Sequence, residues 1–229
     1  MKVRANYAIG YLVLSLLLTL FTLPAWGASD EQTLSNAVTV LQGMMHSKDV
    51  PAGVVAKADC IVVLPSVKKF AVGVGGTGGR GPMSCREGAN FSGKWSTPAM
   101  YSIGGASAGL QIGGTATDYI ILVMNASAVE KLLDGKVKVG SDATAALGPG
   151  ASAGTSVGGA DMLTYSRTSG AFAGVSLNGA TLNPDDDANK RLYGKEVTAK
   201  EIVTGHAVKA TPGGRSLVSV LDTNAGKKQ

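Results

Sequence analysis

Histidine and cysteine, the side chains that most often ligate transition metals, are scarce in this sequence. The 229 residues include two histidines and two cysteines. His46 and His206 are isolated in the sequence, and Cys60 and Cys85 lack the spacing of a zinc site. The sequence therefore predicts neither a metal centre nor a bound cofactor.

Charged residues are also few, at 16% of the chain. The formal net charge is +5, but the first 27 residues carry two of the 21 basic residues and none of the 16 acidic ones. Without them the balance is 19 against 16, a net charge of +3. So small an excess does not support the broad basic surface of a nucleic-acid-binding protein, and we expect no nucleic-acid partner.

Residues 1–27 have the pattern of a secretory signal peptide. Two basic residues precede an apolar stretch over 8–23, and the small residues around Trp26 predict cleavage before Ala28. No cysteine lies near this cut, which argues against a lipoprotein. The alternative is an uncleaved anchor, although the apolar stretch is shorter than the roughly 18 to 20 residues that span a bilayer. We predict an exported protein, periplasmic or secreted.

In an oxidising compartment, an even pair of cysteines most simply forms one disulfide. A bond between Cys60 and Cys85 would close a loop that contains the glycine-rich stretch 72–81, VGVGGTGGRG. The alternative is two unpaired, buried thiols.

Glycine is abundant, with 32 residues, and this abundance favours β-structure. Each glycine in a helix interior costs about 1 kcal/mol relative to alanine, whereas tightly curved sheets tolerate it better. Over 60–125 and again over 137–182, short apolar runs alternate with Gly, Ser and Pro, a pattern typical of strands. We therefore expect a β core over 60–182.

Three segments of this core resemble one another and place Gly, Ala or Ser at alternate positions. They are GGASAGLQIGG (104–114), GPGASAGTSVGGA (148–160) and TSGAFAGVSLNGA (168–180). Small inward-facing residues let a sheet curl tightly. The predicted fold is α+β and mainly β: a small glycine-rich β-barrel, or rolled antiparallel sheet, with three or four short helices packed outside.

Helices are expected before and within the β core. Ser29 begins a capping box, and apolar residues recur at helical spacing over 30–46. A second short helix is predicted over 49–58, which completes a helical lead-in over 30–58. Ser127 with Glu130 predicts a short helix near 127–134.

Further helices are expected over 184–205. Asn183 and Pro184 precede the carboxylates 185–187, which suit the positive end of a helix dipole and need no calcium. Gly194 ends this helix, and Thr198 begins another turn. The remainder, 206–229, is predicted to be a flexible tail.

Two segments resemble nucleotide-binding motifs, but each lacks a feature that nucleotide binding requires. Gly73, Gly75 and Gly78 have dinucleotide-binding spacing, but no helical pattern follows them. The segment 88–95, GANFSGKW, resembles a phosphate loop but has Trp95 where a metal-binding hydroxyl is required.

The pattern G-x-S-x-G occurs at Ser107 and Ser152. A nucleophile elbow needs a strand, a sharp turn and then a helix, and the sequence after Ser107 instead alternates like a strand. We predict no catalytic residues and no enzyme, and we keep a serine hydrolase only as a remote alternative.

Five basic residues cluster around the glycine-rich stretch. Together with backbone amides, their side chains could hold the phosphate of a lipid headgroup. The alternative is a solvated loop whose charges only aid solubility. The five are Lys68, Lys69, Arg80, Arg86 and Lys94.

The order of segments resembles the SYLF domain family over about 30–205, so we place this domain at 28–205. The most specific stretch is YSRTSGAFAGVSL (165–177), followed by LYGKEVTA (192–199). The resemblance implies a β-barrel core with helices on its surface and no catalytic activity. Eukaryotic members bind phosphoinositides, some fungal members bind actin filaments, and bacterial members are typically exported.

One feature departs from the eukaryotic members of the family, which have a basic amphipathic helix that enters the membrane. The corresponding helix here, over 29–46, has no Lys or Arg, so we expect it to pack on the barrel. An exported chain would not meet actin, which we consider an improbable partner. We predict an exported module that weakly binds anionic, phosphoinositide-like headgroups at a membrane surface; the alternative is an interaction protein of the cell envelope.

Overall fold

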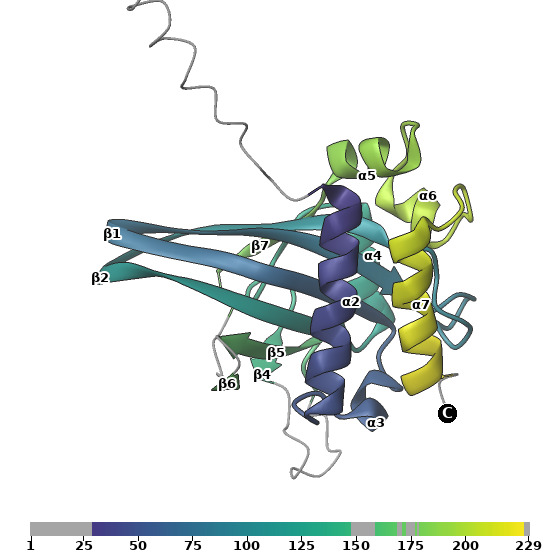
Figure 1. Ribbon diagram of the computed structural model, residues 1–229, viewed down its shortest axis with the longest axis horizontal. Coiled ribbons are helices and arrows are strands. Elements are labelled where there is room, and N and C mark those ends of the chain that lie inside the picture. The colour runs from purple at the N-terminus through teal and green to yellow at the C-terminus, as the bar shows by residue number, and fades with distance from the viewer. Residues whose placement is uncertain (1–28, 148–158, 169–170, 173–176, 178, 227–229) are drawn as a thin grey trace, which may run out of the picture.

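The computed structural model describes residues 29–147, 159–168, 171–172, 177 and 179–226 (Figure 1). The predicted signal peptide and Ser152 lie outside these residues, so the expected export stays a prediction. Within the described part of the chain, no helix is both long and apolar enough to cross a bilayer.

Two long antiparallel strands, β1 (Cys60–Cys85) and β2 (Ala99–Val123), form the centre of the sheet. They pair from Cys60–Val123 to Met83–Ala99. The Cα atoms at the two ends of β1 lie only 3.9 Å apart, so the paired strands double back near their middle. Figure 1 shows this doubled ribbon reaching well past the helices. The separate short strands expected here are therefore wrong: backbone pairing continues through the glycines, because ladder hydrogen bonds need no side chain.

In the part of the chain that the structure describes, five shorter strands complete a seven-stranded sheet. One lies on the later half of β2 and another on its earlier half, and the remaining three pair with these two. Among the named strands of the described residues, β4 pairs with β5 in parallel, and the other pairs are antiparallel. The rolled, mainly β, α+β fold is confirmed, but the described residues form six helices rather than the three or four expected. The five are β5 (Met162–Thr168), β7 (Thr181–Pro184), β3 (Val137–Lys138), β4 (Ala145–Leu147) and β6 (Ala171–Phe172).

Both faces of the sheet are buried near the ends of β1. Side chains alternate between the two faces of a strand. Cys60, Val62 and Leu64 belong to the cluster inside the roll, whereas Ile61 and Val63 belong to the cluster beneath the outer helices. Helices α4 (Ala126–Asp134) and α6 (Ala199–Val203) contribute their buried side chains to the inner cluster.

Helix α2 (Asp30–His46) forms over the predicted range and packs on the sheet as expected. The Ser29 hydroxyl accepts a hydrogen bond from the Gln32 amide, and Leu34, Leu41 and Met44 are fully buried. Helix α3 (Ala52–Val55) is shorter than the predicted 49–58 and begins after Pro51, which lacks the N–H and fixes the backbone there.

Two predicted helix starts are wrong by one or two residues. Asn125, not Ser127, caps α4, because its side chain accepts from the Ala128 amide. Asp185 caps α5 (Asp186–Tyr193), whereas Asn183 and Pro184 belong to β7. The stop at Gly194, in the left-handed conformation, and the capping box of Thr198 with Glu201 are confirmed.

The predicted flexible tail is wrong over most of its length. Residues 212–224 form helix α7 (Pro212–Asn224), which lies beside α2 in Figure 1 and contacts it. Thr211 caps the helix, and Leu217 and Leu221 are fully buried. The apolar residues of SLVSVL recur at helical spacing, and their burial against the sheet and α2 holds the segment in place.

Candidate ligand-binding surface

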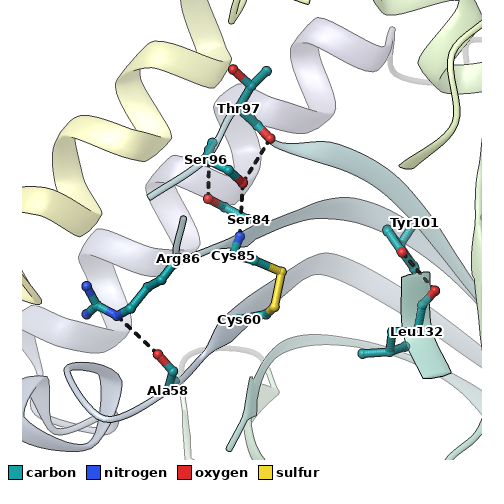
Figure 2. The surroundings of a disulfide bond; sticks show 9 residues. All are labelled: Ala58, Cys60, Ser84, Cys85, Arg86, Ser96, Thr97, Tyr101 and Leu132. Carbon is teal, nitrogen blue, oxygen red and sulfur yellow. Dashed lines mark hydrogen bonds between the residues drawn. A yellow bond between two sulfur atoms is a disulfide. The ribbon is translucent and has the colours of Figure 1, made fainter. Parts of the chain in front are cut away.

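A disulfide joins the two ends of β1, as predicted. Cys60 and Cys85 are both fully buried and bonded to each other (Figure 2). Beside the bond, the Ser84 hydroxyl donates to the Ser96 carbonyl, and the Cys85 amide donates to the Ser96 hydroxyl. The disulfide therefore closes the doubled-back ribbon at its base.

The glycine-rich stretch provides close backbone approach between the two halves of β1. A Cβ on Gly81 would lie 1.9 Å from the Val63 carbonyl oxygen, and one on Gly79 would lie 2.8 Å from the Val67 side chain. A Cβ on Gly78 would meet nothing within 4 Å. The residues after Gly78 continue β1, so no helix begins there to hold a pyrophosphate.

Arg86, one of the five predicted headgroup ligands, is buried, with 1% of its surface exposed. Its guanidinium carbon lies 4.2 Å from the centre of the Trp95 ring. Its Nε donates to the Ala58 carbonyl, and one terminal nitrogen donates to the Ala225 carbonyl at 2.6 Å. Burial lowers the pKa of Arg86, while Asp222 and Asp59 act in the opposite direction. The prediction that Arg86 binds a headgroup is wrong, because this side chain ties together the base of the roll and the end of α7.

Arg80 forms an ion pair with the first residue of α2. One guanidinium nitrogen lies 3.0 Å from a carboxylate oxygen of Asp30, and Arg191 donates to both oxygens of the same carboxylate. Asp30 is almost buried, with 9% exposed. Arg80 therefore helps to fix the start of α2 on the sheet.

The three predicted lysines occupy different surroundings. Lys68 is exposed on β1, and Lys94 is exposed in the loop after β1. Lys69 is half-buried, with its Nζ 5.7 Å from the centre of the Tyr119 ring, and burial lowers its pKa. Lys94 lies at the disulfide end, since its carbonyl accepts from the Glu87 amide next to Arg86.

The five basic residues do not form one cluster. Strands rise about 3.3 Å per residue, so Lys68 lies roughly 25 Å along β1 from Cys60 and the disulfide end. Lys68 and Lys69 therefore lie far from Lys94. Lys68 and Lys69 are adjacent on β1 but lie on opposite faces of the strand.

Two hollows on the surface lie near the disulfide end rather than near these lysines. The smaller, of about 360 Å³, is lined by Glu87, Phe91, Glu130 and His206 among others. The larger, of about 510 Å³, includes Glu87 and Asp222. Each lining combines two carboxylates with one arginine, Arg215 in the larger hollow and Arg86 in the smaller, so neither hollow is a cationic site for an anionic headgroup.

Ser107 lies within β2, opposite Gly75, and not at a turn between a strand and a helix. The geometry of a nucleophile elbow is therefore not formed at this position.

An ion pair that the sequence reasoning missed lies within the stretch YSRTSGAFAGVSL. Arg167 on β5 donates to the carboxylate of Asp49 and to the Gly43 carbonyl at the end of α2. The partners are separated by 118 and 124 residues. No local pattern in a single sequence reveals such a pairing.

Residues 104–224 match the model of the family Ysc84, which is described as "Las17-binding protein actin regulator". The chain belongs to the Ysc84 (SYLF) family. The resemblance seen in the sequence is thereby confirmed.

Several curated relatives are similar to this member of the Ysc84 family. An SH3 domain-containing protein of Schizosaccharomyces pombe is 35% identical over 179 residues, which cover 75% of this chain and 41% of the relative. Protein YSC84 of Saccharomyces cerevisiae is 32% identical over 140 residues, 58% of this chain and 30% of the relative. The human SH3 domain-containing YSC84-like protein 1 is 33% identical over 184 residues, which cover 77% of this chain and 52% of the relative.

This Ysc84-family chain thus spans between 30% and 52% of the length of these relatives. The family description names an actin regulator. The expectation that actin is an improbable partner therefore finds no support in the comparisons.

Proposed function

We propose that this chain is a non-enzymatic binding module of the Ysc84 family that weakly engages anionic, phosphoinositide-like lipid headgroups. The observation that carries the proposal is Lys68, an exposed cation on β1 roughly 25 Å along the strand from the disulfide end. The family description as a binding protein and regulator supports a role without catalysis. The sequence pattern of 1–27 supports export to a periplasmic or secreted location.

The expected affinity is low because few cations are available in one place. A basic residue near an anionic membrane surface contributes about 1 kcal/mol, and salt screens this attraction over about 10 Å at 0.1 M. With Arg86 buried and Arg80 paired with Asp30, Lys68 carries most of the attraction, and Lys94 lies at the other end. Binding should therefore be detectable at low ionic strength and lost at physiological salt.

Vesicle co-sedimentation tests this proposal. The full chain is spun with vesicles of phosphatidylcholine alone or with 30 mol% of an anionic phospholipid, a composition chosen at about physiological anionic charge. We expect the bound fraction to rise with anionic lipid and to fall in Lys68→Gln. Lys57→Gln removes another exposed lysine, beside α3, and serves as the matched control. If Lys68→Gln and the wild type sediment equally, the proposed surface is rejected.

The family description supports a second candidate function, a protein interaction. The matched region 104–224 ends at Asn224, the last residue of α7, and its description names Las17 binding and actin regulation. The partner would then be actin, a regulator of actin or, for an exported chain, a protein of the cell envelope. In the same sedimentation assay, pelleting with filamentous actin in the absence of lipid, unchanged in Lys68→Gln, would favour this candidate over lipid binding.

A further inference from the structure

The smaller hollow, of about 360 Å³, lies beside the loop that follows β1. Its lining comes from three parts of the chain: this loop, helix α4, and the end of α6 with the residues after it. Small-molecule sites usually have a volume of about 300 to 1,000 Å³, so the smaller hollow is large enough for a compact ligand.

Two carboxylates in this lining are available to a ligand. Glu130 is exposed on α4, and its side chain forms no hydrogen bond or ion pair with the residues that the structure describes. Lys200, which Glu130 also attracts, is bonded to Asp134 at 2.8 Å. Glu87 has 34% of its side chain exposed, and its Oε1 lies 3.5 Å from Nδ1 of His206, which carries charge only when protonated. Beside a neutral imidazole, both carboxylates therefore keep their negative charge without an ion-pair partner.

Arg86 also lines the smaller hollow, but its hydrogen bonds are made to the backbone. Burial lowers its pKa, and the nearby charges of Asp222 and Asp59 oppose this effect. The positive charge of Arg86 is therefore balanced within the fold, which leaves the two glutamates to select the charge of a ligand. Each of the three guanidinium nitrogens donates to a carbonyl group, among them those of Ala58, Gly93 and Ala225.

An aromatic ring and apolar side chains complete the lining. Phe91 is partly buried and packs against the inner cluster, and Val203 is 1% exposed. Phe91 and His206 have φ values of 47° and 50°, which residues other than glycine rarely adopt. Such backbone strain persists where the surrounding structure fixes it, and it is common at ligand sites. A ring beside two carboxylates favours an organic cation, because both kinds of group attract positive charge.

We propose that the smaller hollow binds a primary ammonium group carried by a short apolar or aromatic chain. An ammonium has three N–H donors and no acceptor, so it would donate to the carboxylates of Glu87 and Glu130, which only accept. The apolar part of the ligand would contact Phe91 and Val203. A metal ion is a poorer fit, since the described residues contain no group of three or more side chains suited to hold one.

This site does not depend on the proposed headgroup surface. Lys68 lies roughly 25 Å along β1 from the disulfide end, whereas Glu87 in the hollow follows Cys85 by two residues. The two surfaces also select opposite charges, an anion at Lys68 and a cation in the hollow.

Nuclear magnetic resonance of the isotope-labelled full chain, titrated with phenethylammonium chloride at about pH 8, tests the site. An ordinary imidazole is neutral at this pH and does not compete for Glu87. We expect saturable shifts of the backbone amides of Gly88, Phe91 and Thr204, which line the hollow. The neutral 2-phenylethanol and the anionic phenylpropionate should bind at least about threefold more weakly than the ammonium.

Variants on two walls of the hollow define the site. Glu130→Gln, on the exposed face of α4, should weaken binding of the ammonium at least about threefold. Phe91→Leu, which keeps an apolar side chain but removes the ring, should weaken it about twofold or more. Glu196→Gln is the matched control, because this glutamate is 83% exposed and lies outside the lining. It should bind the ammonium like the wild type.

Four outcomes would overturn the site. One is the absence of saturable shifts at the lining amides, and another is shifts confined to Ser219 and Thr223 in the larger hollow. The third is equal affinity in Glu130→Gln and the wild type, with the thermal unfolding of both unchanged. The fourth is 2-phenylethanol binding as tightly as the ammonium. Vesicle sedimentation of Glu130→Gln separates the two proposals, because loss of ammonium binding with normal sedimentation concerns the hollow alone.

Discussion

Removing the disulfide of β1 should destabilise the folded chain without changing its fold. The change is Cys60→Ala together with Cys85→Ala. The other contacts at the base of the roll remain in this variant, since the Arg86 amide still donates to the Asp59 carbonyl at 2.8 Å. The native state should therefore persist, and the loss should come mainly from the greater freedom of the unfolded chain.

The size of the effect follows from the length of the closed loop. The two cysteines are 25 residues apart in the sequence. In the chain-entropy model a loop of this length corresponds to about 3.5 kcal/mol at 25 °C. For a domain of this size, each kcal/mol shifts Tm by roughly 2 to 4 °C, so Tm should fall by about 7 to 14 °C.

Urea unfolding, monitored by the fluorescence of the buried Trp95, measures this loss in the free energy of unfolding. When the wild type is unfolded, reduced and refolded, its free energy of unfolding should fall by a similar amount. The reductant should leave the free energy of unfolding of the double variant unchanged. A decrease below about 1 kcal/mol would refute the reasoning, because the closed loop would then not be constraining the unfolded chain.

Two further predictions concern a glycine contact and a carboxylate. Gly81→Ala should lower the free energy of unfolding by at least about 3 kcal/mol, because the added methyl would overlap the Val63 carbonyl. Gly78→Ala, which has open space around the added methyl, should change it by less than about 1 kcal/mol. Equal urea midpoints for the two variants would contradict the close approach at Gly81. Hydrogen bonds, first of all from Asn125, lower the pKa of Asp161 in the folded chain. The ionised carboxylate therefore stabilises the fold above the unfolded pKa of about 3.9, and this stabilisation is lost as the pH falls through the lower folded pKa. Asp161→Asn should therefore lower the urea midpoint at pH 7, and the difference from the wild type should shrink below pH 4; a gap that stays constant with pH would exclude this role.

The features that the sequence predicted well depend on neighbouring residues. The capping box of Thr198 with Glu201 involves positions three residues apart and forms as expected. At the start of α2 half of the predicted box forms: the Ser29 hydroxyl accepts from the Gln32 amide, whereas the Gln32 side chain donates to Asn36. The disulfide could be predicted because the chain contains only two cysteines. The rolled sheet could be predicted from the many small residues together with the family resemblance, because small inward-facing side chains let a sheet curl tightly.

The errors concern contacts between distant parts of the chain. The sequence groups Arg86 with the other basic residues because it lies near the glycine-rich stretch, but the side chain is buried and its N–H groups donate to backbone carbonyls. One of them, that of Ala225, is 139 residues away in the sequence. The tail was predicted to be flexible for a related reason. Its helix α7 is short and contains two glycines, and burial of Leu217 and Leu221 stabilises it more than its own propensity.

Lys68 and Lys69 are adjacent in the sequence but have different surroundings in the structure, which a count of charges does not reveal. The strand pattern around Lys68 and Lys69 already implied opposite faces, yet the sequence reasoning grouped them as one cationic cluster. The structure places Lys68 in solvent and Lys69 over the buried ring of Tyr119. A variant that changes both lysines would combine two different environments in one result. Because the two side chains share a strand but no face, the effects of Lys68→Gln and Lys69→Gln on vesicle binding must be measured separately, and only Lys68→Gln should lower it.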